Sequence, residues 1–172
     1  TQGRALPHVH SIHVVRDDAL INLPATTRRN LELVKTLRGE DSPTLFSLID
    51  TCQTGMGSRL LKAWLLEPSR DRSEASVRLQ AIGVLRGDSG AASAAPWQIL
   101  RTELKGVSDV ERITARIALR QVRPRELVAL GLTLQKAEQL ARNGSAPAPL
   151  LNQIFDALQP PRDAMELLIQ AI

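Results

Sequence analysis

The sequence predicts a mainly α-helical fold, an antiparallel and bundle-like set of helices preceded by a short extended segment. Its apolar residues, 43% of the 172, are mainly Leu, Ala, Ile and Val, with two Phe, two Trp and no Tyr. Leu and Ala favour helices, whereas strands favour aromatic and β-branched residues. From residue 25 onward, apolar residues recur at helical spacing, and short loops between these stretches favour antiparallel neighbours.

Residues 1–24 have a different pattern from the rest. Val9, Ser11, His13 and Val15 alternate along one side of an extended segment, although their neighbours break strict alternation. Short strands or an extended connector fit this pattern. We therefore expect a boundary at Pro24, with residues 25–172 forming the helical domain.

The first helices of that domain are marked by their ends. We expect a short helix over Ala25–Leu33 and a new helix start at Asp41-Ser42-Pro43, because Ser can cap a helix and Pro suits its first position. The next residues give a buried stripe at helical spacing, formed by Leu45, Leu48 and Ile49. A further helix ends at Glu67-Pro68, since the residue before Pro is disfavoured in a helix.

Later helices carry similar signals. Asp71 with Glu74, and Ser108 with Glu111, have the spacing of capping boxes, and Gly87–Gly90 is a loop. Arg123-Pro124 begins a longer helix that stops at Asn143-Gly144. Two more helices follow a Pro/Ala-rich link, the second opened by a box of Asp163 and Glu166.

Composition excludes some classes of function. The net charge of +4, from 22 basic and 18 acidic residues, permits an acidic partner without requiring one. A single cysteine, Cys52, allows no internal disulfide and favours a reducing compartment. No apolar run approaches the roughly 20 residues that span a bilayer. The start, Thr1-Gln2-Gly3-Arg4, lacks Met and a secretory pattern, so we expect a chain cut from a longer protein.

Three histidines, His8, His10 and His13, form the one metal-like cluster in the sequence. His8 and His10 would share one face of a strand, but His13 would point the other way. No Cys, Asp or Glu lies near enough in sequence to complete a set of ligands. We expect polar strand residues and no metal.

The segment Gly55–Arg59, with the sequence GMGSR, opens a helix, and free amides at a helix start can bind phosphate. A phosphate loop also needs a Gly-Lys-Ser/Thr sequence to engage the phosphates and magnesium. No Gly-Lys pair occurs in the chain. We therefore expect an ordinary helix start.

The remaining candidate residues favour structural roles. Cys52 has no nearby His and is expected to be a core or half-buried thiol, while Trp64 and Trp97 are expected to anchor the core. Several arginines could touch phosphate, but no aromatic residues alternate with them: Arg28, Arg29, Arg59, Arg120, Arg123 and Arg125. The residues alone predict a helical scaffold or interaction element without catalytic, cofactor-binding or metal-binding residues.

Three stretches, in matching order and spacing, go further and resemble the core, or lever, domain of the MutS family of DNA mismatch-repair proteins. They are Ala25–Leu33; Thr44–Asp50 with Gly55–Leu61 and Trp64-Leu65; and Gly106–Arg112 with Arg116, Ala118-Leu119 and Arg123–Leu127. The similarity covers residues 6–130, and the tail is compatible with it. Two departures are Pro24, where the family commonly has Asp, and the Ser/Ala-rich loop Gly87–Pro96.

The resemblance implies a place in a larger machine. MutS proteins are dimers that bind mismatched double-stranded DNA and change conformation with ATP. Residues 1–24 would then be the end of the connector, and residues 25–172 the first half of the lever. The Phe-x-Glu sequence of the mismatch reader is missing, because Phe46 precedes Ser47-Leu48 and Phe155 precedes Asp156-Ala157. The clamp and the ATPase, with its ATP and magnesium, are also missing, so we expect no enzyme activity from this chain.

The resemblance further implies MutL and a second MutS copy as partners of the parent protein, in the cytoplasm of a bacterium and away from membranes. Within the lever, packing positions would transmit motion between the ATPase and the clamp: Leu48, Leu61, Trp64, Ile113 and Leu127. Two alternatives remain open, a helical adaptor that binds other proteins and a MutS paralogue that acts outside mismatch repair.

Overall fold

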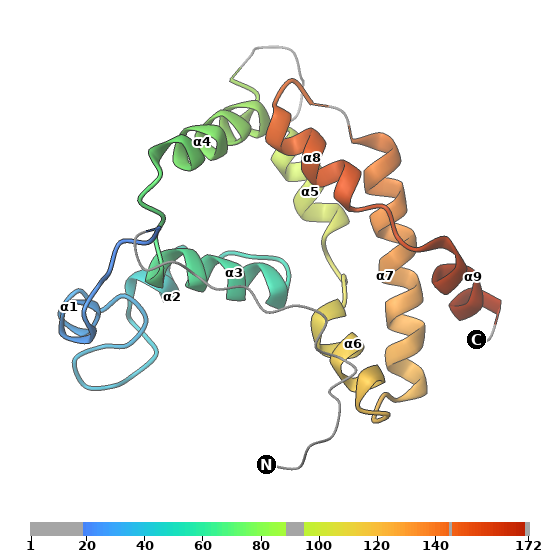
Figure 1. Cartoon of the computed structure of the whole chain (residues 1–172), viewed down its shortest axis with the longest axis horizontal. Helices are drawn as coiled ribbons and strands as arrows, with labels where there is room; N and C mark the ends of the chain where they lie inside the picture. Colours follow the sequence, from blue (N-terminus) through green and yellow to red (C-terminus); the bar gives the residue numbers. More distant parts are fainter. Residues whose placement is uncertain (1–18, 89–94, 145, 171–172) are drawn as a thin grey trace. The chain divides into compact units, whose positions relative to one another are not determined.

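The computed structural model describes residues 19–88, 95–144 and 146–170, and these residues fold into helices (Figure 1). This confirms the predicted fold class. The nine helices in the described residues are α1 (Ala25–Asn30), α2 (Leu45–Ile49), α3 (Gly55–Leu66), α4 (Arg72–Arg86), α5 (Pro96–Glu103), α6 (Val110–Ala118), α7 (Pro124–Asn143), α8 (Pro149–Ala157) and α9 (Arg162–Gln170).

Most of the predicted extended segment lies outside the described residues, including all three histidines. Its described end is tied to a loop by one isolated antiparallel bridge, between Leu20 and Ser69. The amide of Ile21 donates to the carbonyl of Pro68 at 2.8 Å, and the amide of Arg70 donates to that of Ala19 at 3.0 Å. Residues 19–24 therefore run beside the turn that follows α3.

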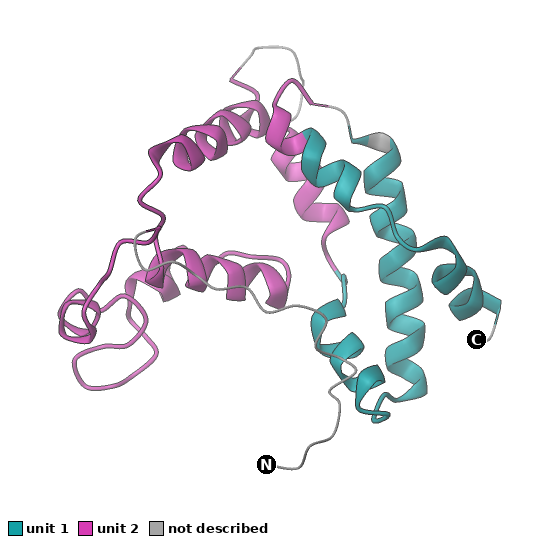
Figure 2. Cartoon of the chain, in the orientation of Figure 1, with its two compact units in different colours: residues 1–15, 106–145, 152–172 teal, residues 16–105, 146–151 magenta. Residues whose placement is uncertain are grey.

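The chain divides into two compact units (Figure 2). Within the described residues, unit 1 comprises residues 106–144 and 152–170, and unit 2 comprises residues 19–88, 95–105 and 146–151. Helix α8 begins in unit 2 and ends in unit 1.

In unit 2, the caps of α2 and α3 are both threonines, and for α2 this replaces the predicted Ser42. Thr44 has an extended backbone, and its side chain accepts from the amide of Ser47 at 3.1 Å. The Ser47 hydroxyl in turn accepts from the amide of Thr44 at 2.8 Å, which completes a reciprocal capping box. Thr54 caps α3 by accepting from the amide of Gly57 at 3.1 Å. The predicted start at Ser42-Pro43 was thus two residues early.

Helices α4 and α5 pack against each other in unit 2. Asp71 caps α4, as predicted, by accepting from the amide of Ser73 at 2.8 Å. Glu74 pairs with Arg78 one turn later instead of with the cap. At the other end, Gly87 has a φ of +78°, a left-handed conformation that suits glycine at a helix end.

In unit 1, α7 lies between α6 and α9 and packs against both. Helices α6 and α7 run in opposite directions, joined by a short turn (Figure 1). At 20 residues, α7 is about 30 Å long. The buried side chains of unit 1 include Ile113 of α6, Leu130 and Thr133 of α7, and Met165 of α9. Helix α7 is thus the central element of the unit.

Helix α6 corrects a second predicted cap. Its N-cap is Asp109, which accepts from the amide of Arg112 at 3.2 Å, and not the preceding Ser108. By contrast, the beginning of α7 at Arg123-Pro124 and its end at Asn143-Gly144 are confirmed.

Five residues predicted to pack in the core are exposed, and they include Leu45 and Ile49 of the predicted buried stripe. Leu48 is 77% exposed, Trp64 42% and Trp97 41%. Leu48 belongs to a helix of only five residues, which is too short to bury a complete apolar stripe. Of the other predicted packing positions, Ile113 is buried and Leu61 and Leu127 are half-buried. None of the helices in the described part of the chain is long and apolar enough to cross a bilayer.

Candidate functional site

The joint between α6 and α7, which we define as the elbow (residues 106–126), contains several polar links between the two helices and the adjacent loops. Arg116 on α6 pairs with the carboxylate of Glu126 on α7. The same carboxylate accepts from the backbone amide of Arg123 at 2.9 Å. This bond to Arg123, and then the nearby guanidinium of Arg116, lower the pKa of Glu126. Glu126 therefore fixes the first turn of α7 and connects it to α6.

A second link joins the start of the elbow to the middle of α7. The backbone amide of Ser108 donates to the hydroxyl of Thr133 at 3.0 Å, across 25 residues of sequence. Thr133 is buried, at 5% exposure. A buried amide that lacks an acceptor is costly, so this hydroxyl holds the loop before α6 against α7.

The end of α6 contains an unusual left-handed residue. Arg120 has a φ of +56°, the conformation that glycine usually supplies at this position. Its amide donates to the carbonyl of Ile117 at 2.9 Å, and the amide of Gln121 donates to that of Arg116 at 2.8 Å. These two bonds are the Schellman pattern, which terminates α6 and turns the chain toward α7.

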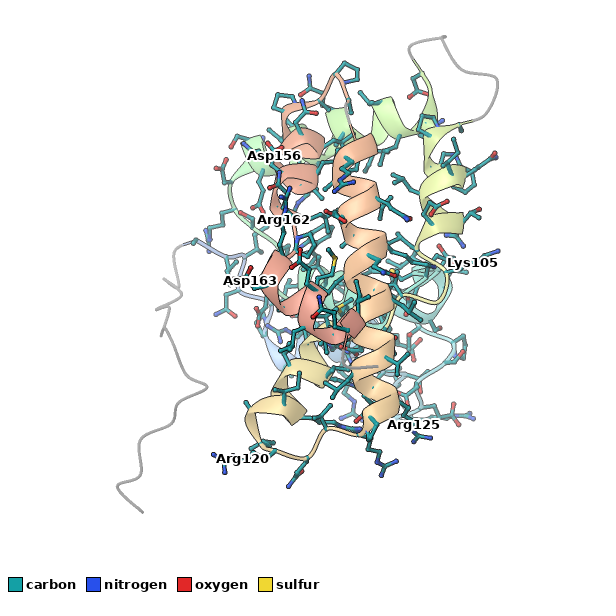
Figure 3. The ribbon with its side chains drawn as sticks, turned by 90° about the vertical axis from the view of Figure 1, so that its right-hand side faces the viewer. Lys105, Arg120, Arg125, Asp156, Arg162 and Asp163 are labelled. Carbon is teal, nitrogen blue, oxygen red and sulfur yellow. The ribbon has the colours of Figure 1, made fainter. Side chains whose placement is uncertain are left out.

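Arginines gather at the tip of the elbow. In Figure 3 the labelled side chains of Arg120 and Arg125 lie at the end of unit 1 where α6 turns into α7. Arg123, between them in sequence, is also exposed. None of the three forms an ion pair with a residue that the structure describes. They form a basic tip, without the interleaved aromatic residues of a base-stacking surface.

The other arginines singled out from the sequence lie in unit 2. Arg59 on α3 already has an interaction partner. Arg28 and Arg29 on α1 line a hollow of about 460 Å³. We call it the α1 hollow, and its other lining residues are Ala25, Val34, Lys35, Thr36, Leu37, Arg38, Gly39 and Leu66. The loop after α1 adds two further cations to this pair, Lys35 and Arg38, which the sequence pattern did not predict.

The Gly55–Arg59 segment is an ordinary helix start, as predicted, because Thr54 caps α3 at Gly57. The hydroxyl of Ser58 binds the carboxylate of Asp50, and this bond lowers the pKa of that carboxyl. The Thr54 side chain thus accepts from one of the backbone amides that lack a partner within the first turn of α3.

Cys52 corrects another prediction, because the residue is exposed, whereas a core or half-buried thiol was expected. Partial burial of its thiol, followed by the nearby Asp50 carboxyl, raises the pKa of Cys52. A raised pKa disfavours the thiolate, which is the form that attacks substrates or binds metals. Cys52 therefore does not resemble an activated nucleophile.

Metal chemistry has no candidate among the described residues, where no group of three His, Cys, Asp or Glu side chains could hold an ion. The three histidines lie outside those residues. What the described geometry offers is mechanical, namely a central helix tied to its neighbours at the elbow by an ion pair, a buried hydroxyl and a buried apolar face.

One family model matches most of the chain. A family model described as MutS domain III matches residues 26–172, which covers all of the helices above except the first residue of α1.

Proposed function

This chain belongs to the MutS family of mismatch-repair proteins through its domain III, and on that premise we propose that it serves as a mechanical lever. It would couple the ATP state of the parent's ATPase domain to the position of the parent's DNA clamp. The observation that carries the proposal is the elbow, because coupling between distant sites needs rigid elements whose relative placement is held by specific contacts.

Helix α7 supports this role by its length and its connections. A helix keeps its rise per residue, so a movement at one end reaches the other along about 30 Å. Glu126 ties its first turn to α6, and Thr133 ties its middle to the loop before α6. A push on α6 would therefore be passed to α7 rather than absorbed by a loose joint.

The wider role follows from the family. We propose that the parent binds mismatched DNA and ATP with magnesium, works as a dimer, recruits MutL, and acts in the bacterial cytoplasm. The chain itself would contribute no catalytic group. Purified alone, it should neither hydrolyse ATP nor prefer mismatched duplex over perfect duplex, and robust turnover would contradict the proposal.

The coupling is tested by Thr133→Val in the full-length parent. Valine keeps the shape of threonine but cannot accept from the Ser108 amide, which loosens the link between the elbow and α7. We expect ATP hydrolysis to persist while ATP-dependent release of mismatched DNA slows. Thr133→Ser restores the hydroxyl and should restore release. Thr102→Val is the matched control, because Thr102 is exposed and its hydroxyl donates within α5 to the carbonyl of Gln98.

If Thr133→Val folds and releases DNA at the normal rate on ATP binding, the elbow is not part of the coupling. The sequence of the neighbouring domains provides a separate test of the wider role. A Phe-x-Glu reader upstream supports mismatch repair, whereas its absence beside a retained ATPase supports a paralogue with another duty.

A further inference from the structure

We propose that the α1 hollow is a binding site for a small phosphate-bearing anion, such as inorganic phosphate, pyrophosphate or the phosphate end of a nucleotide. The hollow lies in unit 2, between α1, the loop that follows it and the end of α3. This site is separate from the elbow, and the proposal does not depend on the lever function.

The first argument is charge. Among the described residues, the lining includes four cationic residues, Arg28, Arg29, Lys35 and Arg38, and no acidic residue. Guanidinium groups match the geometry of phosphate oxygens and bind them through paired hydrogen bonds.

The second argument is an unmet hydrogen-bond donor. The Nε of Arg28 is buried and has no partner among the residues that the structure describes. A charged donor that loses its water without gaining an acceptor is costly. Arg28 also lines a smaller neighbouring hollow of about 230 Å³, which includes Glu67. That carboxylate makes no hydrogen bond to the Nε, so this donor has no acceptor among the residues that the structure describes.

The third argument is that the loop is already held in shape. The Arg29 guanidinium donates to the carbonyl of Leu37 at 3.1 Å, and the amide of Leu37 donates to the Glu32 carboxylate at 2.7 Å. The amide of Thr36 donates to the carbonyl of Glu40 at 2.9 Å. A preformed site avoids the entropy cost of ordering a loop on binding.

The four cationic side chains differ in whether they already bind other groups of the chain. Lys35 lies 2.5 Å from the carboxylate of Asp41, and Arg29 is used by the Leu37 carbonyl. Arg38 is exposed and forms no ion pair with a described residue. Arg28 and Arg38 are therefore the residues that we assign to the anion, with Lys35 and Arg29 adding to the local field.

The shape favours a small ligand over a duplex. A volume of about 460 Å³ falls in the range of small-molecule sites. The remaining lining is largely apolar, from Ala25, Val34, Leu37 and Leu66. A concave site of this kind suits a terminal phosphate, whereas the outer backbone of a duplex is convex and better matched by an open surface.

The experiment is an NMR titration of the 15N-labelled chain with pyrophosphate at 150 mM NaCl. We expect saturable shifts confined to the amides of residues 28–39. Arg38→Gln should weaken the apparent affinity about tenfold, the loss expected for one charge-assisted hydrogen bond. Arg28→Gln tests the buried donor. Because that change could unfold the loop, Arg38→Gln, at an exposed position, is the deciding variant.

The matched control is Arg125→Gln, which removes the same charge from the basic tip in unit 1 and should leave the affinity unchanged. Parallel titrations use inorganic phosphate, a short single strand with or without a 5′ phosphate, and a blunt duplex. Stronger binding of the phosphorylated strand supports a terminal-phosphate site. Pyrophosphate shifts that do not saturate, equal affinity of Arg38→Gln, or binding to duplex alone would each overturn the proposal.

Discussion

The guanidinium carbon of Arg78 lies 3.8 Å from the centre of the Trp64 ring. This contact joins α4 to α3 within unit 2, and it explains how a tryptophan that is 42% exposed still contributes to packing. One face of the Trp64 ring is covered by the Arg78 guanidinium rather than by apolar side chains of a core. The same Arg78 also pairs with Glu74 on its own helix, so its side chain is held from two directions.

The Trp64–Arg78 contact should be measurable as a coupling. We expect a double-mutant cycle of Trp64→Leu and Arg78→Ala to give an interaction free energy of about 0.5–1 kcal/mol in urea unfolding. The cycle isolates the ring contact, because the ion pair between Arg78 and Glu74 is lost both in the single Arg78→Ala variant and in the double variant, so its effect cancels. Additive effects of the two changes would show that the stacking contributes nothing to stability.

Gly144 should resist substitution for a packing reason. A Cβ at this position would lie 2.2 Å from the ring of Phe155, so the helix end or the ring would have to move. We expect Gly144→Ala to destabilise the chain by about 1–3 kcal/mol, as in overpacked cores. Thermal unfolding checks this.

The paired control is Gly131→Ala in the middle of α7. There a Cβ would meet Leu168 at 3.5 Å, an ordinary contact, and alanine favours the helix. This variant should match or exceed the stability of the parent sequence. A Gly131→Ala protein less stable than Gly144→Ala would contradict the packing described here.

Arg120 occupies a left-handed position that glycine would adopt without strain. We expect Arg120→Gly to raise the free energy of unfolding by about 1 kcal/mol, because a side chain at positive φ is disfavoured by that order. Gly87→Ala, at the equivalent end of α4, should lower it by a similar amount. If Arg120→Gly instead destabilises the chain, contacts of the arginine side chain outweigh the backbone strain. Chemical denaturation measures both.

Glu126 should make the free energy of unfolding depend on pH in the acid range. Its pKa is lowered from 4.5 in the folded chain by the Arg123 amide and then by Arg116. Its contribution is therefore complete above pH 4.5 and is lost as the pH falls through the lower folded-state value. Glu126→Gln should reduce the slope of stability against pH in this acid range. Comparing urea unfolding at pH 6 and pH 3 tests it, and identical slopes in both proteins would exclude a role for this carboxylate.

Local sequence determined much of the helical pattern. Arg123-Pro124 and Asn143-Gly144 mark the true ends of α7, and Asp71 and Gly87 bound α4. Such signals work because the orphan amides and carbonyls of a helix end are satisfied by residues within a few positions. Helix α9 begins at Arg162, before its predicted cap Asp163, and α1 ends at Asn30 rather than at the predicted Leu33. The predicted starts of α2 and α6 were also wrong by one or two residues. In α2 and α6 two nearby side chains were able to cap the helix, Ser42 or Thr44 and Ser108 or Asp109. The backbone conformation selected Thr44 and Asp109.

The candidate sites depended far more on tertiary structure. The sequence spacing of Ser108 and Thr133, 25 residues apart, does not indicate that the amide of Ser108 donates to the hydroxyl of Thr133. The α1 hollow likewise required the fold of the loop after α1 to bring Lys35 and Arg38 beside Arg28.

By itself, then, the sequence determined the helical class, most helix ends and, through its motifs, the family. Tertiary structure decided which apolar residues are covered, leaving Leu48 exposed and Ile113 buried although both have helical spacing. The physical reason is one of range. Helix formation and capping are settled between residues three or four apart, whereas burial and charge pairing depend on which distant elements pack together.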